Sequence, residues 1–94
     1  MAWRLVVQPN GLYARYSDVV DDFTDYDMTR DEAFTLCRDA GGVDVANYKL
    51  GTADAAADRF RESISLIRAV HGAATAMERR AELSQTPVQE TDNQ

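Results

Sequence analysis

Seven acidic residues crowd into fifteen positions of this 94-residue chain, and this segment constrains the fold more than any other feature of the sequence. Arg30 is the one basic residue between positions 18 and 32. The whole chain has a formal net charge of −6, and residues 18–32 supply nearly all of it. Carboxylates gathered on one face of a helix repel one another, so a chain selected only for stability would rarely place them there. A local charge excess creates a field with a definite place, which makes the segment a candidate recognition surface.

Residues 18–26 are predicted to form a short helix. At about 100° per residue, four aspartates fall within an arc of roughly 100° of a helix, and the apolar side chains fall opposite them. As a strand, the same stretch has no clean alternation. Ser17 suits the N-cap position, and an acidic first turn suits the helix dipole. The partner-binding residues that this helix would present are Asp18, Asp21, Asp22, Asp25, Asp27 and the aromatic Tyr26.

The N-terminal residues predict a β-hairpin. Trp3 to Gln8 alternates apolar and polar side chains with the period of a half-buried strand. Asn10-Gly11 is a strong signal for a type I′ turn, because both residues tolerate positive φ. Leu12 to Tyr16 is then the returning strand, so the chain is expected to begin with two antiparallel strands.

A capping box predicts the next helix. Thr29 can cap the helix while Glu32, three residues later, reaches back to the Thr29 backbone. The helix is expected over residues 30–40, with Gly41-Gly42 ending it. Residues 43–50 are left open, with one helical turn as one possibility.

A single long helix is expected over residues 52–83, capped by Thr52. Thirty residues of helix are about 45 Å long, whereas a domain of this size is about 25–30 Å across. The helix would therefore overhang, kink near Gly72 or pack on another chain. Its apolar stripe has near-heptad spacing and is the candidate oligomer interface, formed by Phe60, Ile64, Ile67, His71, Ala74 and Met77.

These elements predict an α+β fold, with an N-terminal β-hairpin packed on two or three α-helices and a long C-terminal helix. Residues 1–83 would form a single domain, and the polar residues 84–94 a disordered tail. No apolar run is long enough to cross a membrane, and the single Cys37 cannot form an internal disulfide. A cytoplasmic protein is expected. A sequence pI of about 4.5 argues against direct nucleic-acid binding.

The sequence offers little chemistry for an enzyme. It has no glycine-rich phosphate loop, no zinc-ligand spacing and no nucleophile motif, so no catalytic residue and no cofactor are assigned. Residues 25–29 begin like a calcium loop, but Arg30 stands where such a loop needs glycine and Leu36 where it needs glutamate. No metal ligands are therefore assigned.

The stretch VVQPNGLYARYSDVVDDFTDYDMTRDEA, residues 6–33, resembles the opening of small uncharacterised proteins encoded by bacteriophages and prophages. The resemblance covers 28 of the 94 residues and brings no fold, activity or catalytic residue with it. It implies a phage origin. Small acidic phage proteins often act by binding and blocking host machinery, including nucleic-acid-handling defence complexes.

The sequence therefore favours a non-enzymatic protein-binding module whose acidic face, residues 18–32, contacts a basic surface of a protein partner. Such a module would act as an inhibitor if the partner is a host or defence complex. Two alternatives stay open. One is a small homo-oligomeric structural protein, such as a homodimer, assembled through the 52–83 helix, in which the acids only solvate the surface. The other is a divalent-metal-binding protein.

Overall fold

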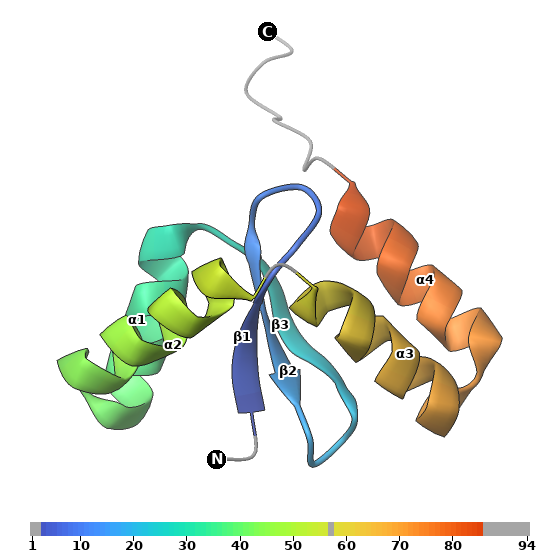
Figure 1. The fold of residues 1–94 in the computed structure, drawn as a ribbon, viewed down its shortest axis with the longest axis horizontal. Coiled ribbons are helices and arrows are strands. Elements are labelled where there is room, and N and C mark those ends of the chain that lie inside the picture. The colour runs from blue at the N-terminus through green and yellow to red at the C-terminus, as the bar shows by residue number, and fades with distance from the viewer. Residues whose placement is uncertain (1–2, 57, 86–94) are drawn as a thin grey trace, which may run out of the picture.

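A computed structural model of the protein describes residues 3–56 and 58–85. Its elements are β1 (Trp3–Val7), β2 (Tyr13–Ser17), β3 (Asp22–Met28), α1 (Arg30–Gly41), α2 (Val43–Ala55), α3 (Arg59–His71) and α4 (Ala73–Ser84). The fold is α+β, as the sequence predicts, with a three-stranded antiparallel sheet in the order β1-β2-β3 followed by the helices. Figure 1 shows the sheet between two helical hairpins, α1–α2 on one side and α3–α4 on the other.

The predicted N-terminal hairpin is confirmed, although its turn differs from the expected type. Val6 pairs with Ala14 and Arg4 with Tyr16. Gly11 has a φ of +87°, whereas Asn10 is not among the described residues with positive φ, so the turn is not type I′. The Asn10 side chain instead accepts a hydrogen bond from the Leu12 N–H at 3.0 Å, in the manner of an Asx turn.

The helix predicted over residues 18–26 is wrong, because this segment forms a turn and then β3. Tyr16 pairs with Phe23, and the β2–β3 ladder has two register shifts. Such bulges break the alternation of side chains along the strand, so the sequence has no period-2 pattern that would predict it. Asp21 (φ 52°) and Asp27 (φ 57°) adopt the left-handed conformation, which aspartate tolerates better than most residues. Pairing with β2 therefore outweighs the helical periodicity of the aspartates.

The capping box at the start of α1 is confirmed. The Glu32 N–H donates to the Thr29 hydroxyl at 3.1 Å, and the Thr29 N–H donates to the Glu32 carboxylate at 2.8 Å. The helix ends at the predicted glycines, since Gly42 has a φ of +96°. The open segment 43–50 belongs to a full helix, α2.

The single long helix predicted over residues 52–83 is wrong. Thr52 lies inside α2, where its hydroxyl donates to the Tyr48 carbonyl at 2.8 Å, so it caps nothing. At Gly72, with a φ of +99°, the chain reverses and α4 folds back on α3. The kink expected near Gly72 is therefore a full reversal, which removes the overhang. The tail predicted from residue 84 lies outside the described residues, apart from Ser84 at the end of α4 and Gln85.

The two helical hairpins repeat one design at a spacing of thirty residues. Gly42 and Gly72 join their helices with nearly the same backbone angles, φ/ψ of 96°/175° and 99°/166°. Each glycine N–H donates to the carbonyl four residues earlier, that of Arg38 at 2.7 Å and that of Arg68 at 3.0 Å. The same spacing relates residues of the second helices: Ala46 to Ala76, Lys49 to Arg79 and Ala53 to Leu83. Helical hairpins of the same kind thus cover both faces of the sheet, α1–α2 on one face and α3–α4 on the other.

Each face of the sheet has its own apolar core. The core beneath α1–α2 contains the buried residues Leu5, Tyr13, Ala33, Cys37, Ala46, Leu50 and Ala53. The core beneath α3–α4 contains Val6, Ala14, Tyr16, Phe23, Phe60, Ile67, Ala76 and Leu83. Successive residues of a strand point to opposite faces, so β1 and β2 contribute to both cores.

A buried glutamine joins the first hairpin to the end of the last helix. Gln8 is 2% exposed. Its Nε2 donates to Asp27 Oδ1 at 2.8 Å and to the Leu83 carbonyl at 2.9 Å, while its Oε1 accepts from the Asp27 N–H at 2.6 Å. Asn10 Nδ2 adds a bond to the Gln85 carbonyl at 2.7 Å. This network fixes α4 to the sheet.

Replacing Gln8 with alanine is expected to destabilise the protein, because the partly buried Asp27 N–H and the buried Leu83 carbonyl would lose their partner. A loss of about 1–3 kcal/mol in the free energy of unfolding is expected from urea denaturation. The matched control is Gln85→Ala, which removes an exposed side chain and is expected to stay within about 0.5 kcal/mol of wild type. Equal stability of the two variants would contradict the structural role of Gln8.

Two tyrosines on opposite faces of β2 allow a second comparison. The buried Tyr16 hydroxyl has no hydrogen-bond partner among the described residues, and burial raises its pKa to about 12. The Tyr13 hydroxyl donates to Asp54 Oδ1 at 2.7 Å. Tyr16→Phe is therefore expected to leave the free energy of unfolding unchanged or higher, whereas Tyr13→Phe should cost about 1–3 kcal/mol. A thermal or urea unfolding series in which Tyr16→Phe costs as much as Tyr13→Phe would refute this assignment.

Candidate functional site

The acidic segment covers the turn between β2 and β3, then β3, which is an edge strand of the sheet, and then the first turn of α1, where Asp31 and Glu32 lie. Three of its carboxylates are paired with arginines from other parts of the chain. The pairs are Arg4–Asp18 at 3.1 Å, Arg15–Asp25 at 2.6 Å and Arg79–Asp22 at 3.0 Å. The continuous row of unpaired carboxylates that a helix would present is therefore not formed, and arginines partly neutralise the charge.

Asp22 is held most tightly of the six predicted partner-binding residues. Arg79 Nε donates to Oδ1 at 3.0 Å and to Oδ2 at 3.2 Å, and Arg79 Nη2 donates to Oδ2 at 3.0 Å. Burial raises the pKa of the Asp22 carboxyl, but the bonds from Arg79 and from the Phe23 N–H more than offset it, so the pKa lies below its usual value. The pair fixes the start of β3 to α4.

Asp27 and Asp21 also have structural roles. Asp27 belongs to the Gln8 network and adopts a positive φ, as does Asp21 in the turn. Charges and bulges on an edge strand prevent it from pairing with strands of other molecules. Much of the acidic character of β3 therefore follows from its place at the sheet edge. Tyr26, which is 47% exposed, stays accessible to a partner.

The predicted oligomer interface is divided between core and surface. Phe60 and Ile67 are buried in the core beneath α3–α4, and Ile64 packs against the same core. His71 is exposed, and its Nε2 donates to the Val20 carbonyl at 2.9 Å. Ala74 is exposed, and Met77 is 71% exposed. The first half of the predicted stripe therefore belongs to the core. The second half lies on a surface that forms because the chain reverses at Gly72.

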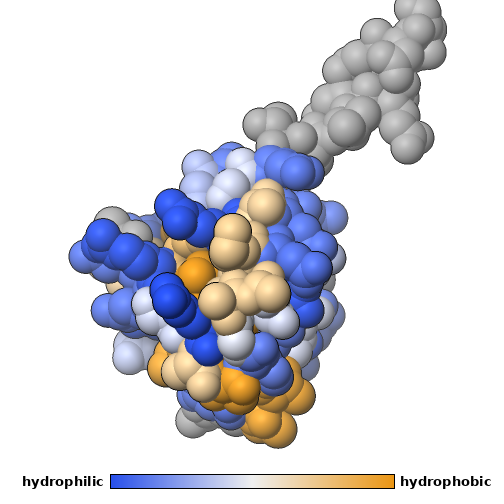
Figure 2. Space-filling model, turned by 90° about the vertical axis from the view of Figure 1, so that its right-hand side faces the viewer, coloured by the Kyte–Doolittle hydropathy of each residue, from blue (hydrophilic) through white to orange (hydrophobic). Residues whose placement is uncertain are grey.

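That surface contains an open groove between α3 and α4. Two adjoining hollows of 330 Å³ and 210 Å³ share Ile64, Arg68 and Arg80. We call this the α3–α4 groove and define it by Phe60, Arg61, Ile64, Arg68, Ala73, Ala76, Met77 and Arg80. Figure 2, which views the molecule from the right-hand side of Figure 1, shows apolar residues along this side of the molecule with strongly hydrophilic groups beside them.

The arginines of the α3–α4 groove differ in their partners. Arg61 is exposed and pairs with Asp58 at 2.7 Å. Arg68 and Arg80 form no ion pair with any described residue. Because the chain has 16 acidic and 10 basic residues, carboxylates outnumber cations, and most arginines could form an ion pair within the molecule. Two cations beside an apolar groove are thus left available for an external anion.

The sequence prediction missed Arg68 and Arg80 because it treated residues 52–83 as one long helix. Twelve residues of helix would separate the two arginines by about 18 Å. The reversal at Gly72 brings both to one groove. The signal that could have found them is the recurrence of an apolar helix ending in glycine, at Gly42 and again thirty residues later at Gly72.

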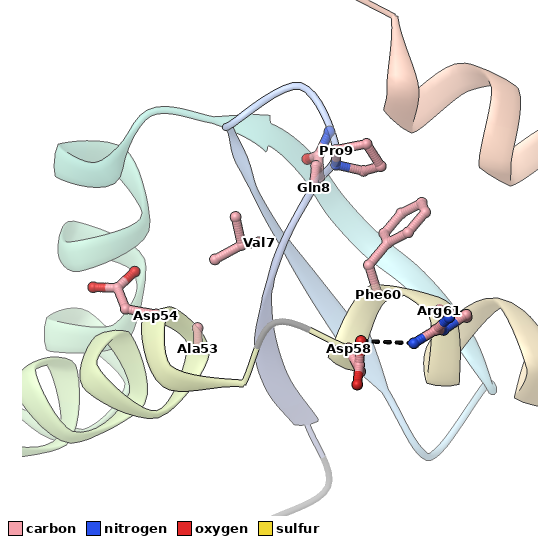
Figure 3. A pocket seen from close by; sticks show the side chains of 8 residues that line it. All are labelled: Val7, Gln8, Pro9, Ala53, Asp54, Asp58, Phe60 and Arg61. Atoms are coloured by element: carbon pink, nitrogen blue, oxygen red, sulfur yellow. Dashed lines mark hydrogen bonds and ion pairs between the residues drawn. The ribbon is translucent and has the colours of Figure 1, made fainter.

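A second cleft, of 490 Å³, lies between α2 and α3 beside the end of β1 (Figure 3). Its lining contains two carboxylates, both already engaged. Asp54 accepts from the Tyr13 hydroxyl at 2.7 Å and from Arg30 at 3.0 Å, and these bonds hold the pKa of its carboxyl below the usual value. Asp58 pairs with Arg61, as the dashed line in Figure 3 marks. The other lining side chains are Val7, Gln8, Pro9, Ala53 and Phe60, so this cleft combines no nucleophile with a base.

Within residues 3–56 and 58–85, no three His, Cys, Asp or Glu side chains are grouped so that they could hold a metal ion. In the same ranges, no helix has the length and apolar character needed to span a membrane. Comparison of the chain with protein-family models, with curated proteins and with solved structures finds no match.

The Asp22–Arg79 pair makes stability depend on pH in a defined direction. The pKa of Asp22 is lower in the folded state, so its contribution is complete above the unfolded value of about 3.9 and is lost as the pH falls through the folded value. Asp22→Asn is expected to cost about 1.5–3 kcal/mol at pH 7. That cost should shrink at acid pH, where the wild-type carboxyl is also neutral.

The matched control for this pair is Asp18→Asn, which removes an exposed ion pair with Arg4 and should cost less than about 1 kcal/mol. Urea denaturation of the three proteins between pH 7 and pH 3 measures both effects. A cost for Asp22→Asn that does not change over this range would be inconsistent with the ion pair.

Proposed function

We propose that this chain is a non-enzymatic protein-binding module that contacts its partner through the α3–α4 groove. The observation that carries the proposal is the combination of an exposed apolar surface with two unpaired arginines, Arg68 and Arg80. Met77 and Ile64 supply apolar contact area beside these cations. Arginine and methionine are both enriched at protein interfaces, where the guanidinium supplies bonds in a fixed geometry.

The form of the groove favours a protein over a small molecule. It is an open channel between two helices, whereas small-molecule sites enclose most of their ligand. A nucleic acid fits poorly, because the chain carries a net charge of −6 and the acidic turn Asp18–Asp21 lies near the end of α3.

The resemblance of residues 6–33 to phage and prophage proteins makes a host protein the first partner to seek. Binding through the groove would make this chain an inhibitor if the occupied surface of the partner is needed for its activity. Such a role, in the host cytoplasm, remains our proposal for the biological setting.

The acidic segment is a second candidate surface. Asp21, in the turn before β3, and Asp31, in the first turn of α1, form no ion pair with a described residue, and Tyr26 is exposed on β3. A basic partner could therefore still contact this edge. Asp22 is excluded from the test of this surface, because changing it would break its bonds with Arg79 and confound binding with stability.

The test is capture of partners from a lysate of the bacterial host with immobilised protein, followed by mass spectrometry. We expect a protein that wild type retains and that Arg68→Glu with Arg80→Glu loses, because charge reversal opposes an acidic partner surface. Arg38→Glu is the matched control, since Arg38 holds the equivalent position in α1 and should retain the partner. Circular dichroism establishes that each variant is folded.

The same experiment separates the two surfaces. A partner that survives the arginine reversals but is lost with Asp21→Asn and Asp31→Asn would move the site to the acidic segment and contradict the groove. If wild type retains nothing beyond the resin control, binding of a host protein is contradicted altogether.

A further inference from the structure

We infer that the α3–α4 groove is filled by the β2–β3 turn of a second copy of this chain, so that two copies bind each other reciprocally. The inference rests on the proposed function, because it names an occupant for the same groove. It follows from the chemistry of the turn, from the chemistry of the groove and from their positions on one molecule.

The β2–β3 turn exposes apolar side chains where turns usually expose polar ones. Val19 is 76% exposed and Val20 is 50% exposed. Carboxylates lie directly on either side of them, at Asp18 and Asp21. The turn therefore presents a small apolar tip between two carboxylates, of which Asp18 is paired with Arg4 at 3.1 Å and Asp21 forms no ion pair with a described residue.

The groove has the complementary character. Its apolar lining includes Ile64 and Met77, and its unpaired cations are Arg68 and Arg80. A branched apolar side chain entering the hollow of 210 Å³ would bring its flanking carboxylates toward these two arginines. Apolar contact and opposite charge would then act at the same place.

The turn does not occupy the groove of its own molecule. His71 Nε2 bonds the Val20 carbonyl at 2.9 Å, which holds the turn beside the end of α3. Ile64 lies seven residues before His71 along α3, a rise of about 10 Å. The turn is thus held at the C-terminal end of α3, about 10 Å along the helix from Ile64, and none of its residues lines either hollow of the groove.

A twofold axis between turn and groove would place each turn over the groove of the other copy. Such an isologous contact closes on itself and forms a dimer, because the same surface is used twice. A dimer built only by stacking the two α3–α4 hairpins would bring Arg68 and Arg80 against their own copies. Reciprocal insertion of the acidic turn avoids that repulsion, which is why we favour it over the plain helix stripe.

The test is the oligomeric state of the full chain by sedimentation velocity over a series of protein concentrations. Wild type is expected to dimerise, and added salt should weaken the dimer because charges contribute to it. Arg68→Glu should raise the dissociation constant about tenfold or more, since it removes one attraction and adds a repulsion. Arg38→Glu, at the equivalent position of the other hairpin, should leave the dissociation constant unchanged.

A charge swap makes the test specific for the turn. The groove variant carries Arg68→Glu with Arg80→Glu. The turn variant carries Asp18→Lys with Asp21→Asn, and asparagine suits the positive φ at position 21. Each variant alone should be monomeric where wild type is a dimer, whereas an equimolar mixture should form a heterodimer, because both reciprocal contacts again join opposite charges.

Several outcomes would overturn the inference. They are a wild-type monomer at every concentration, a dimer that Arg68→Glu leaves intact, and a mixture of the two variants that stays monomeric. Unfolded variants are recognised by circular dichroism, and the milder Val19→Ser then replaces the turn variant, with loss of dimer expected and a persisting dimer counting against the inference. A monomeric protein that still captures a host partner through Arg68 and Arg80 would overturn this inference while leaving the proposed function in place.

Discussion

The three-stranded sheet at the centre of this protein is apolar on both faces, and the rest of the structure follows from the need to cover both. Leu5 and Tyr13 point toward one hairpin of helices, while Val6 and Tyr16 point toward the other. A small sheet with two apolar faces would otherwise leave about half of its core residues in water. Each face is covered by a pair of helices that reverses at a glycine, Gly42 or Gly72, in nearly the same conformation.

Many of the charged side chains of this protein form ion pairs with each other within the molecule. The acidic segment that dominates the composition is joined to β1, β2 and α4 by Arg4, Arg15 and Arg79. These pairs, with the bulges of β3, give a sheet edge that resists pairing with other strands. The composition therefore drew attention to the anions, whereas the structure leaves two cations, Arg68 and Arg80, beside exposed apolar surface. Binding is proposed at the place where unpaired arginines lie beside exposed apolar surface.

Local signals in the sequence located those elements whose stabilising contacts are close in the chain. The capping box joins Thr29 and Glu32 three positions apart, and the first hairpin is marked by its Asn10-Gly11 turn and by alternation along its strands; both were found. The strand β3 was missed because its periodicity is interrupted by bulges and its stability comes from pairing with β2. The spacing of the aspartates matches one face of a helix, and no rule based on neighbouring residues distinguishes this spacing from that of a real helix.

The sequence by itself predicts an α+β fold, the position of the first hairpin, and the cap and end of α1, and it contains no recognisable enzyme motif. The tertiary structure decided which surfaces are free. Phe60 and Ile67 became core because α3 packs on the sheet, while Met77 became surface because α4 turns back at Gly72. Arg68 and Arg80 came together for the same reason. Caps and turns are fixed by neighbouring residues, whereas burial and ion pairing depend on which distant segments the fold brings into contact.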